Sequence, residues 1–378
     1  MTLNIDKQTD TTEIHILFKK THIKTQSIVL ISLTVIILLL SCDIFKPQIQ
    51  PGSRNYVWEI DTLYMPMNYI STVWGASPND LWAMGAGGTA NDRLLHFDGT
   101  NWSTYTNESI NCTGYALFGF GENNIWMGGG AEWPDSEGGA IWHYDGQTWE
   151  NYFIYALDEH FHSIRISDIW GTSSDDVYAC GTISFYDGTN ECWRGFALHF
   201  DGTDWSEIAR ADFNSQFLEI NRTDESVFIF SFGINYDGPD TVAFYMIDND
   251  SLQQIYSNQE NNISWAGMSI IEGKEYFTID NDVYLYENEE LNNVLSINYD
   301  DFWWKVFGRN EKDLFFVMRD GFVHYNGTDM EYIYKLPSSD MRFIGEPLII
   351  GDHIYICLRY PGFNELILHG KLDDIDQE

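Results

Sequence analysis

The sequence predicts an all-β protein, a seven-bladed β-propeller of four-stranded antiparallel blades. Two observations lead to this prediction: a motif that recurs at the length of one blade, and a strand-like segment ahead of the first copy that would complete the last blade. The composition agrees, because 44% of the 378 residues are hydrophobic and 16% are aromatic. A chain of this length can bury a large core, and aromatic residues favour strands.

The recurring motif has two parts. An aromatic-Gly pair such as Trp74-Gly75 stands five residues before an Asp or Asn, here Asp80, that opens a β-prone segment. A run such as His96-Phe97-Asp98-Gly99 follows, and an apolar residue, here Trp102, stands five positions after the aromatic. Four strong and three weaker copies have their anchors at Asp80, Asn124, Asp176, Ser226, Glu275, Asp313 and His353. The average spacing of about 45 residues is typical of a four-stranded blade, and six or eight blades are the alternatives.

Each copy predicts four strands, here named A to D. Strand A ends at the aromatic-Gly pair, B follows the anchor, C ends at the His-aromatic pair, and D begins at the apolar residue after the turn. Asp-Gly or Asn-Gly pairs at 98–99, 145–146, 201–202 and 326–327 suit the positive φ of a tight C–D turn. No segment of helical period and useful length follows the N-terminal region.

The two ends of the chain predict how the ring closes. The seventh copy has strands A, B and C, but the chain ends before a full D strand. The segment Tyr56-Val57-Trp58-Glu59-Ile60 looks like a D strand without a blade of its own. Pairing it with the last blade removes an open sheet edge, so we expect the N-terminal strand to close the ring.

The first 41 residues predict an export signal. Lys19, Lys20 and Lys24 precede the apolar run 28–40, which is short for a membrane-spanning helix. The run ends in Leu39-Leu40-Ser41-Cys42, which resembles the lipobox of bacterial lipoproteins. The resemblance implies that Cys42 is lipidated and holds the protein to a membrane of the bacterial cell envelope, in the periplasm or at the cell surface. An uncleaved membrane anchor is the alternative. We expect residues 1–41 to be the signal peptide, 42–54 a tether and 55–378 the propeller domain.

The repeats also resemble known propeller families. Gly128-Gly129 with Tyr144 and Trp149 is similar to the kelch pattern, with a shorter Tyr-to-Trp spacing. Asp145 to Trp149 is similar to an Asp-box, without the usual residue between Asp and Gly. The chain most closely resembles the Trp-Gly-repeat propellers of bacterial lipoproteins. This likeness implies the fold and says little about activity, because propellers serve unrelated functions.

Residues that occupy the same place in every copy are expected to be structural. The template histidines should each bond within their own blade, the template Asp residues should form turns, and the template Trp residues should pack between blades. The histidines are His96, His143, His199, His324 and His369.

Function is expected where the template is interrupted. The long insertions fall in B–C links, including 128–139, 181–194 and 232–240, and in D–A links, which emerge on the same face of a propeller. Their aromatic and acidic residues suit a sugar or a protein partner, and Ca²⁺ binding or plain solvation are alternatives. The candidate binding residues are Glu132, Trp133, His160, His162, Tyr186, Asp187, Trp193 and Tyr236. His160 and His162 also suggest a metal site, for which no further ligand is identified.

The chemistry of the whole chain limits its function. The net charge of −37 argues against nucleic acid, because phosphates are neutralised by clustered Lys and Arg. No phosphate loop, nucleophile elbow or paired zinc-binding cysteine motif is present. Cys180 and Cys192 flank one predicted hairpin link, so a disulfide between them is one alternative.

We therefore expect a monomeric, lipid-anchored binding propeller that holds a protein or carbohydrate on the face with the long links. The alternative is a glycan-active hydrolase or lyase that uses carboxylates on that face. We favour a non-enzymatic protein without a cofactor.

Overall fold

The fold was derived from a computed structural model, which describes residues 52–63, 69–86, 94–106, 110, 113–130, 138–157, 163–234, 240–248, 251–258, 266–360 and 366–373. By its internal contacts the chain divides into Met1–Gln50 and Pro51–Glu378, and the described residues all belong to the second unit. In this part of the chain every regular element is a β-strand. No helix of the described residues is long and apolar enough to cross a membrane.

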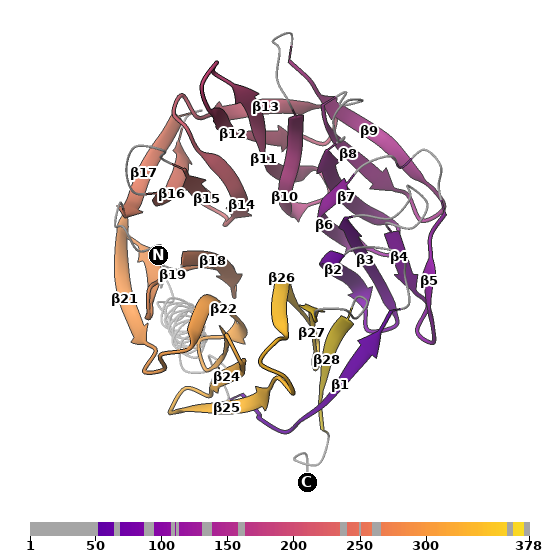
Figure 1. The fold of residues 1–378 in the computed structure, drawn as a ribbon, viewed down its shortest axis with the longest axis vertical. Coiled ribbons are helices and arrows are strands. Elements are labelled where there is room, and N and C mark those ends of the chain that lie inside the picture. The colour runs from indigo at the N-terminus through magenta and orange to yellow at the C-terminus, as the bar shows by residue number, and fades with distance from the viewer. Residues whose placement is uncertain are drawn as a thin grey trace, which may run out of the picture. The chain divides into compact units, whose positions relative to one another are not determined.

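Seven four-stranded antiparallel sheets follow one another around a ring, which confirms the predicted seven-bladed propeller (Figure 1). Blade 1 contains β2 (Tyr69–Ser77), β3 (Asp80–Ala86), β4 (Leu94–Phe97) and β5 (Trp102–Thr104). Blade 2 contains β6 (Thr113–Gly121), β7 (Asn124–Gly130), β8 (Gly139–Tyr144) and β9 (Trp149–Tyr155). Blade 3 contains β10 (Ser163–Ser173), β11 (Asp176–Tyr186), β12 (Glu191–Phe200) and β13 (Trp205–Arg210).

The second half of the ring repeats the same order. Blade 4 contains β14 (Gln216–Arg222), β15 (Val227–Gly233), β16 (Thr241–Asp248) and β17 (Ser251–Asn258). Blade 5 contains β18 (Ala266–Ile271), β19 (Lys274–Ile279), β20 (Asp282–Glu287) and β21 (Glu290–Ser296). Blade 6 contains β22 (Phe302–Asn310), β23 (Asp313–Met318), β24 (Gly321–Tyr325) and β25 (Met330–Lys335).

Blade 7 joins the two ends of the domain. It contains β26 (Arg342–Ile350), β27 (His353–Arg359) and β28 (Leu366–Leu372), with β1 (Tyr56–Thr62) as its outer strand. β1 pairs antiparallel with β28 from Tyr56↔Leu372 to Thr62↔Leu366. The prediction that the N-terminal strand closes the ring is therefore confirmed.

The five-residue spacing of the template places two apolar side chains opposite each other across each C–D turn. Phe97 pairs with Trp102 and Tyr144 with Trp149. The aromatic residue of strand B in the preceding blade packs against such a pair: the rings of Trp82 and Trp149 are 5.5 Å apart and nearly perpendicular. Edge-to-face contacts of this kind stabilise a core beyond the area that they bury.

All seven blade junctions repeat this packing, so the template aromatics are interblade core as predicted. The strand-B residues that occupy the junctions are Trp82, Trp126, Tyr178, Phe228, Tyr276, Phe315 and Tyr355.

The template histidines have a structural role. His96 Nε2 lies 2.7 Å from the Asp80 carboxylate, and the imidazole stacks on Trp82 with a centroid distance of 4.3 Å. His143, His199 and His324 make the same bond to the anchors of their own blades. Blade 7 departs from this pattern, because its anchor is His353, whose Nδ1 lies 2.7 Å from His369 Nε2. The template histidines thus tie strand C to the start of strand B.

The template Asp residues form the C–D turns, as predicted. Asp98 Oδ1 accepts hydrogen bonds from the backbone N–H groups of Thr100 and Asn101, and Gly99 has a φ of 86°. The same bonds recur at Asp145, Asp201 and Asn326. These bonds hold the carboxylate oxygen in a fixed turn geometry.

Candidate functional site

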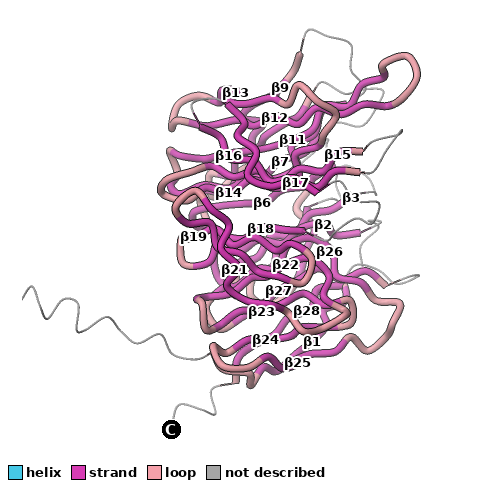
Figure 2. Tube along the Cα trace, turned by 90° about the vertical axis from the view of Figure 1, so that its left-hand side faces the viewer, coloured by secondary structure: helices cyan, strands magenta, loops and turns pink. Residues whose placement is uncertain are grey.

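The long insertion of blade 3 is a strand extension, which corrects the prediction of a link over residues 181–194. β11 continues to Tyr186 and β12 begins at Glu191, so only four residues join them. The extended hairpin stands on one edge of the ring, on the side of the described D–A link over residues 211–215 (Figure 2). The register pairs Cys180 with Ala197 and Cys192 with Phe185. Both thiols are free, so the disulfide alternative is wrong.

A groove lies beside this hairpin, between blades 3 and 4. Its volume is about 620 Å³. We call it the rim groove, and its lining residues are Asp187, Asn190, Cys192, Phe213, Asn214, Ser215, Ser231, Gly233, Ile234, Thr241, Ala243, Tyr245 and Gln254. The lining combines amide and hydroxyl groups with two aromatic rings, and it contains no Lys or Arg. Such a mixture of ring faces with amide and hydroxyl groups, beside the Asp187 carboxylate, suits a peptide segment or a sugar.

The floor of the rim groove is held by two hydrogen bonds of the Asn214 side chain and one between backbone groups. Asn214 Oδ1 accepts from the Trp193 N–H at 2.7 Å, and Asn214 Nδ2 donates to the Ile234 carbonyl at 2.7 Å. Ser215 N–H donates to the Trp193 carbonyl at 3.0 Å. One D–A link therefore joins the blade 3 hairpin to blade 4 at the floor of the groove.

Three of the predicted site residues lie on this hairpin. Tyr186 is exposed (56%), and its hydroxyl donates to the Thr189 carbonyl. Trp193 is half-buried and its backbone builds the groove floor. Asp187 lines the groove, and its Oδ1 accepts from the N–H groups of Thr189 and Asn190. Asp187 thus makes the same turn as the template Asp residues. The sequence already contains the signal, because Asp187-Gly188-Thr189-Asn190 repeats the letters of 98–101.

The other predicted site residues lie outside the described part of the chain. They are Cys42, Glu132, Trp133, His160, His162 and Tyr236. Within the described residues, no group of three or more His, Cys, Asp or Glu side chains could hold a metal ion.

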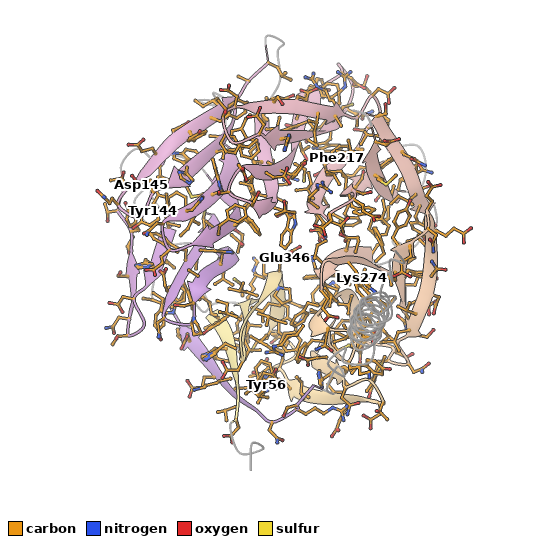
Figure 3. The ribbon with its side chains drawn as sticks, turned by 180° about the vertical axis from the view of Figure 1, so that it is seen from behind. Tyr56, Tyr144, Asp145, Phe217, Lys274 and Glu346 are labelled. Carbon is orange, nitrogen blue, oxygen red and sulfur yellow. The ribbon has the colours of Figure 1, made fainter. Side chains whose placement is uncertain are left out.

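A second concave site, the central channel, was not predicted from the sequence. It has a volume of about 500 Å³ and is lined by the innermost strands of all seven blades, β2, β6, β10, β14, β18, β22 and β26 (Figure 1). Four charged side chains from different blades line it: Asp168, Glu219, Lys305 and Glu346. Figure 3 shows Glu346 at the centre of the ring.

Lys305 is the cation of this cluster. Its side chain is only 4% exposed, and Nζ donates to Glu219 Oε2 at 3.1 Å and to Glu346. Burial raises the pKa of Glu219 to about 7, although the Lys305 ammonium acts in the opposite direction. Burial also raises the pKa of Asp168, and the charge of Glu346 raises it further.

A buried carboxyl group stands behind the channel wall. Glu275 is 2% exposed, and its Oε1 accepts from Asn221 Nδ2 at 2.9 Å. Its Oε2 has no hydrogen-bond partner among the described residues. Burial raises the pKa of this carboxyl to about 8. The folded state therefore favours a protonated Glu275.

This shift predicts how stability changes with pH. The pKa of Glu275 is higher in the folded state than the usual value of 4.5. The folded state therefore binds this proton more tightly than the unfolded state does. The contribution of the protonated group to stability is complete below pH 4.5 and is lost as the pH rises through about 8. Glu275→Gln keeps the shape without the charge. We expect the variant to be more stable than wild type by up to roughly 4 kcal/mol at pH 9 and nearly equal to it at pH 5. Thermal unfolding at both pH values measures the difference.

The control for this prediction is Glu290→Gln, which removes one exposed carboxyl from the same blade. It should leave the pH dependence unchanged. An equal effect of Glu275→Gln at pH 5 and pH 9 would contradict a protonated Glu275.

With both concave sites described, comparison with known proteins adds information on the fold. No family model and no curated protein matches the chain. Among solved structures, the chain is similar to YCF48 bound to a D1 peptide, with a TM-score of 0.55 and 13% sequence identity. The match covers 87% of this chain and all of that one. The likeness is one of fold. It agrees with the propeller described above, whereas the resemblance to Trp-Gly-repeat and kelch-like families stays a prediction.

Proposed function

We propose that this protein is a lipid-anchored, extracytoplasmic interaction propeller that holds a protein partner at the rim groove. The observation that supports it most is a preformed groove next to exposed aromatic side chains. Tyr186 and Phe213 are 56% and 37% exposed, and both belong to segments that border the groove. Large aromatic residues at a surface are typical of contact centres between proteins.

The chemistry of the rim groove supports a polypeptide. Thr241, Gln254 and Asn190 offer hydroxyl and amide groups to a peptide backbone, while Phe213 and Tyr245 offer rings to a side chain. These two rings lie 5.6 Å apart. YCF48, whose fold is similar, was solved with a bound peptide. A carbohydrate partner is the other ligand that this lining suits.

The groove itself can be tested with full-length protein in detergent. A photo-crosslinker attached to Cys192 in a Cys112→Ser background would capture the partner, since Cys192 lines the groove while Cys180 and Cys357, the other free thiols of the described residues, are buried. We expect Tyr186→Ala and Phe213→Ala each to weaken capture by about 1 kcal/mol or more, roughly fivefold, without a change in melting temperature. Quantitative pull-down from envelope extracts measures this loss.

The matched control is Tyr152→Ala, because Tyr152 is 46% exposed on the outer strand β9 of blade 2, away from the groove. It should bind like wild type. If Phe213→Ala and Tyr186→Ala capture as much partner as Tyr152→Ala does, the rim groove is not the binding site. A glycan array with the same variants distinguishes a carbohydrate from a protein partner.

The membrane anchor is tested separately. Cys42→Ser is expected to leave the precursor uncleaved and without acyl chains, because the thiol is the acceptor of the lipid. Each buried CH₂ of an acyl chain contributes about 0.8 kcal/mol to membrane attachment. Mass spectrometry of the wild-type N-terminus measures the lipidation, and membrane fractionation of both proteins measures the attachment to the membrane. A wild-type protein without lipid would refute the anchor.

A glycan-active hydrolase or lyase is the second candidate function. The pKa of Glu219, raised to about 7, favours it, because a general acid must keep its proton near neutral pH. Asp168 lines the same channel and could act as its partner. Release of reducing sugar from a glycoside panel by wild type, and its loss in Glu219→Gln, would establish this function.

A further inference from the structure

The central channel contains more negative than positive charge. Asp168, Glu219 and Glu346, from three different blades, lie around one ammonium, that of Lys305, from a fourth blade. Lys305 pairs with both Glu219 and Glu346. Asp168 has no ion-pair partner among the described residues. Its two oxygens accept hydrogen bonds from the N–H groups of Ile169 and Ile220, each at 2.9 Å.

The Asp168 carboxylate is therefore held in place by backbone groups and repelled by its neighbours. The charges of Glu346 and Glu219 both oppose its ionisation. An added cation between these carboxylates would remove the repulsion. The site is open to solutes, because the Glu346 side chain is 54% exposed.

Aromatic rings line the same channel. Trp74, Phe118, Trp170 and Phe307 contribute one ring from each of four blades, and the rings of Phe118 and Trp170 lie 4.8 Å apart. The face of an aromatic ring attracts ammonium and guanidinium groups. Ser167 Oγ also lines the channel beside Asp168, and it has no hydrogen-bond partner among the described residues. This hydroxyl is thus a buried polar group at the channel wall that the described residues leave without a hydrogen bond.

We propose that the central channel binds an organic cation, an ammonium or guanidinium group, which pairs with Asp168 and Glu346 and lies against the aromatic rings. A metal ion fits less well, because the described His, Cys, Asp and Glu side chains form no group of three or more that could hold one. The volume of about 500 Å³ suits a small polyamine or a single arginine side chain. This site is distinct from the rim groove and does not depend on the protein partner proposed there.

The test measures binding of two probes to the full chain in detergent. Spermidine represents a free amine, and a capped Gly-Arg-Gly peptide represents the side chain of a polypeptide. The corresponding citrulline peptide has the same shape without the charge. Isothermal titration and quenching of the channel tryptophans report binding. We expect at least one of the two cations to bind. If the arginine peptide binds, the citrulline peptide should bind at least tenfold more weakly.

Variants locate the site. Asp168→Asn should weaken binding of the cation at least tenfold, and Glu346→Gln at least fivefold. Glu346 is largely exposed, so its variant should fold even if Asp168→Asn does not. Glu150→Gln, which removes an exposed carboxyl from outer strand β9, is the matched control and should bind like wild type. The proposal is overturned if neither cation binds, if Glu346→Gln binds like Glu150→Gln, or if the channel binds Ca²⁺ and neither organic cation.

Discussion

Deletion of β1 is expected to destabilise the propeller by several kcal/mol, enough to prevent a stable fold at 37 °C. The strand pairs with β28 along its whole length, so its loss exposes a sheet edge. It also removes Tyr56, Trp58 and Ile60, three partly buried side chains that pack against the interblade core. Trp58 stacks on Phe322 at 5.6 Å, and Tyr56 meets the edge of Phe315 at 5.8 Å. Full burial of one such side chain contributes about 1.5–3 kcal/mol, so three partly buried ones together contribute several kcal/mol.

The control is a deletion of residues 43–50, which leaves Gly52 and Arg54 in place. These two residues contact blade 6: the Gly52 N–H donates to the Lys312 carbonyl, and Arg54 forms an ion pair with Asp329 at 2.7 Å. Circular dichroism melting of both deletions measures the effect. Equal melting temperatures would mean that β1 does not hold the ring together.

Trp149→Ala is expected to cost about 3–5 kcal/mol of folding free energy, because it leaves a cavity between blades 1 and 2. Trp149 is 2% exposed. It packs against Trp82, and it pairs across the turn with Tyr144, which itself lies 5.1 Å from Trp82. Alanine cannot fill this space, and the rings of Trp82 and Tyr144 cannot move into it, because each is fixed in its own sheet.

Chemical unfolding of full-length protein measures the loss, with Tyr186→Ala as the control for an exposed aromatic. Tyr186 lies on the rim, so its variant should lose less than about 0.5 kcal/mol. A loss below 1 kcal/mol for Trp149→Ala would show that the junctions do not depend on their template rings.

The fold could be predicted from the sequence because its main contacts are fixed by short spacings. An aromatic residue and an apolar one five positions later must meet across a tight hairpin turn, as Phe97 and Trp102 do. The anchor and the template His lie on adjacent strands, so Asp80 and His96 meet without any long-range information. Repetition of these local contacts then specifies a ring.

The central channel could not be predicted in the same way. Its charged residues lie on separate blades, and the distance between Asp168 and Lys305 along the chain gives no sign that they share a cavity. A signal does exist within strand A. Asp168 and Lys305 each stand two positions before the template aromatic, Trp170 or Phe307. Charged side chains at this template position lie on the innermost strands and therefore come together at the central axis of the ring.

The rim was predicted only in part. Tyr186 and Trp193 do lie beside a groove, but the insertion that carries them is a regular hairpin. Its sequence alternates too weakly to distinguish an extended strand from a loop. Phe213 was not selected as a site residue, although it lies in one of the D–A links expected to carry function, the link that joins the hairpin to blade 4.

The pairing of β1 with β28 determines when the domain can finish folding. The two strands are more than 300 residues apart in the sequence, so the most distant contacts of the chain are also the ones that seal it. Synthesis from the N-terminus releases Trp58 and its neighbours long before their partners exist. We expect that strand to remain exposed, and available to chaperones or proteases, until the C-terminal residues emerge. A product truncated ahead of residue 366 would keep six blades and still lack a closed ring. We expect such a product to be degraded in the cell.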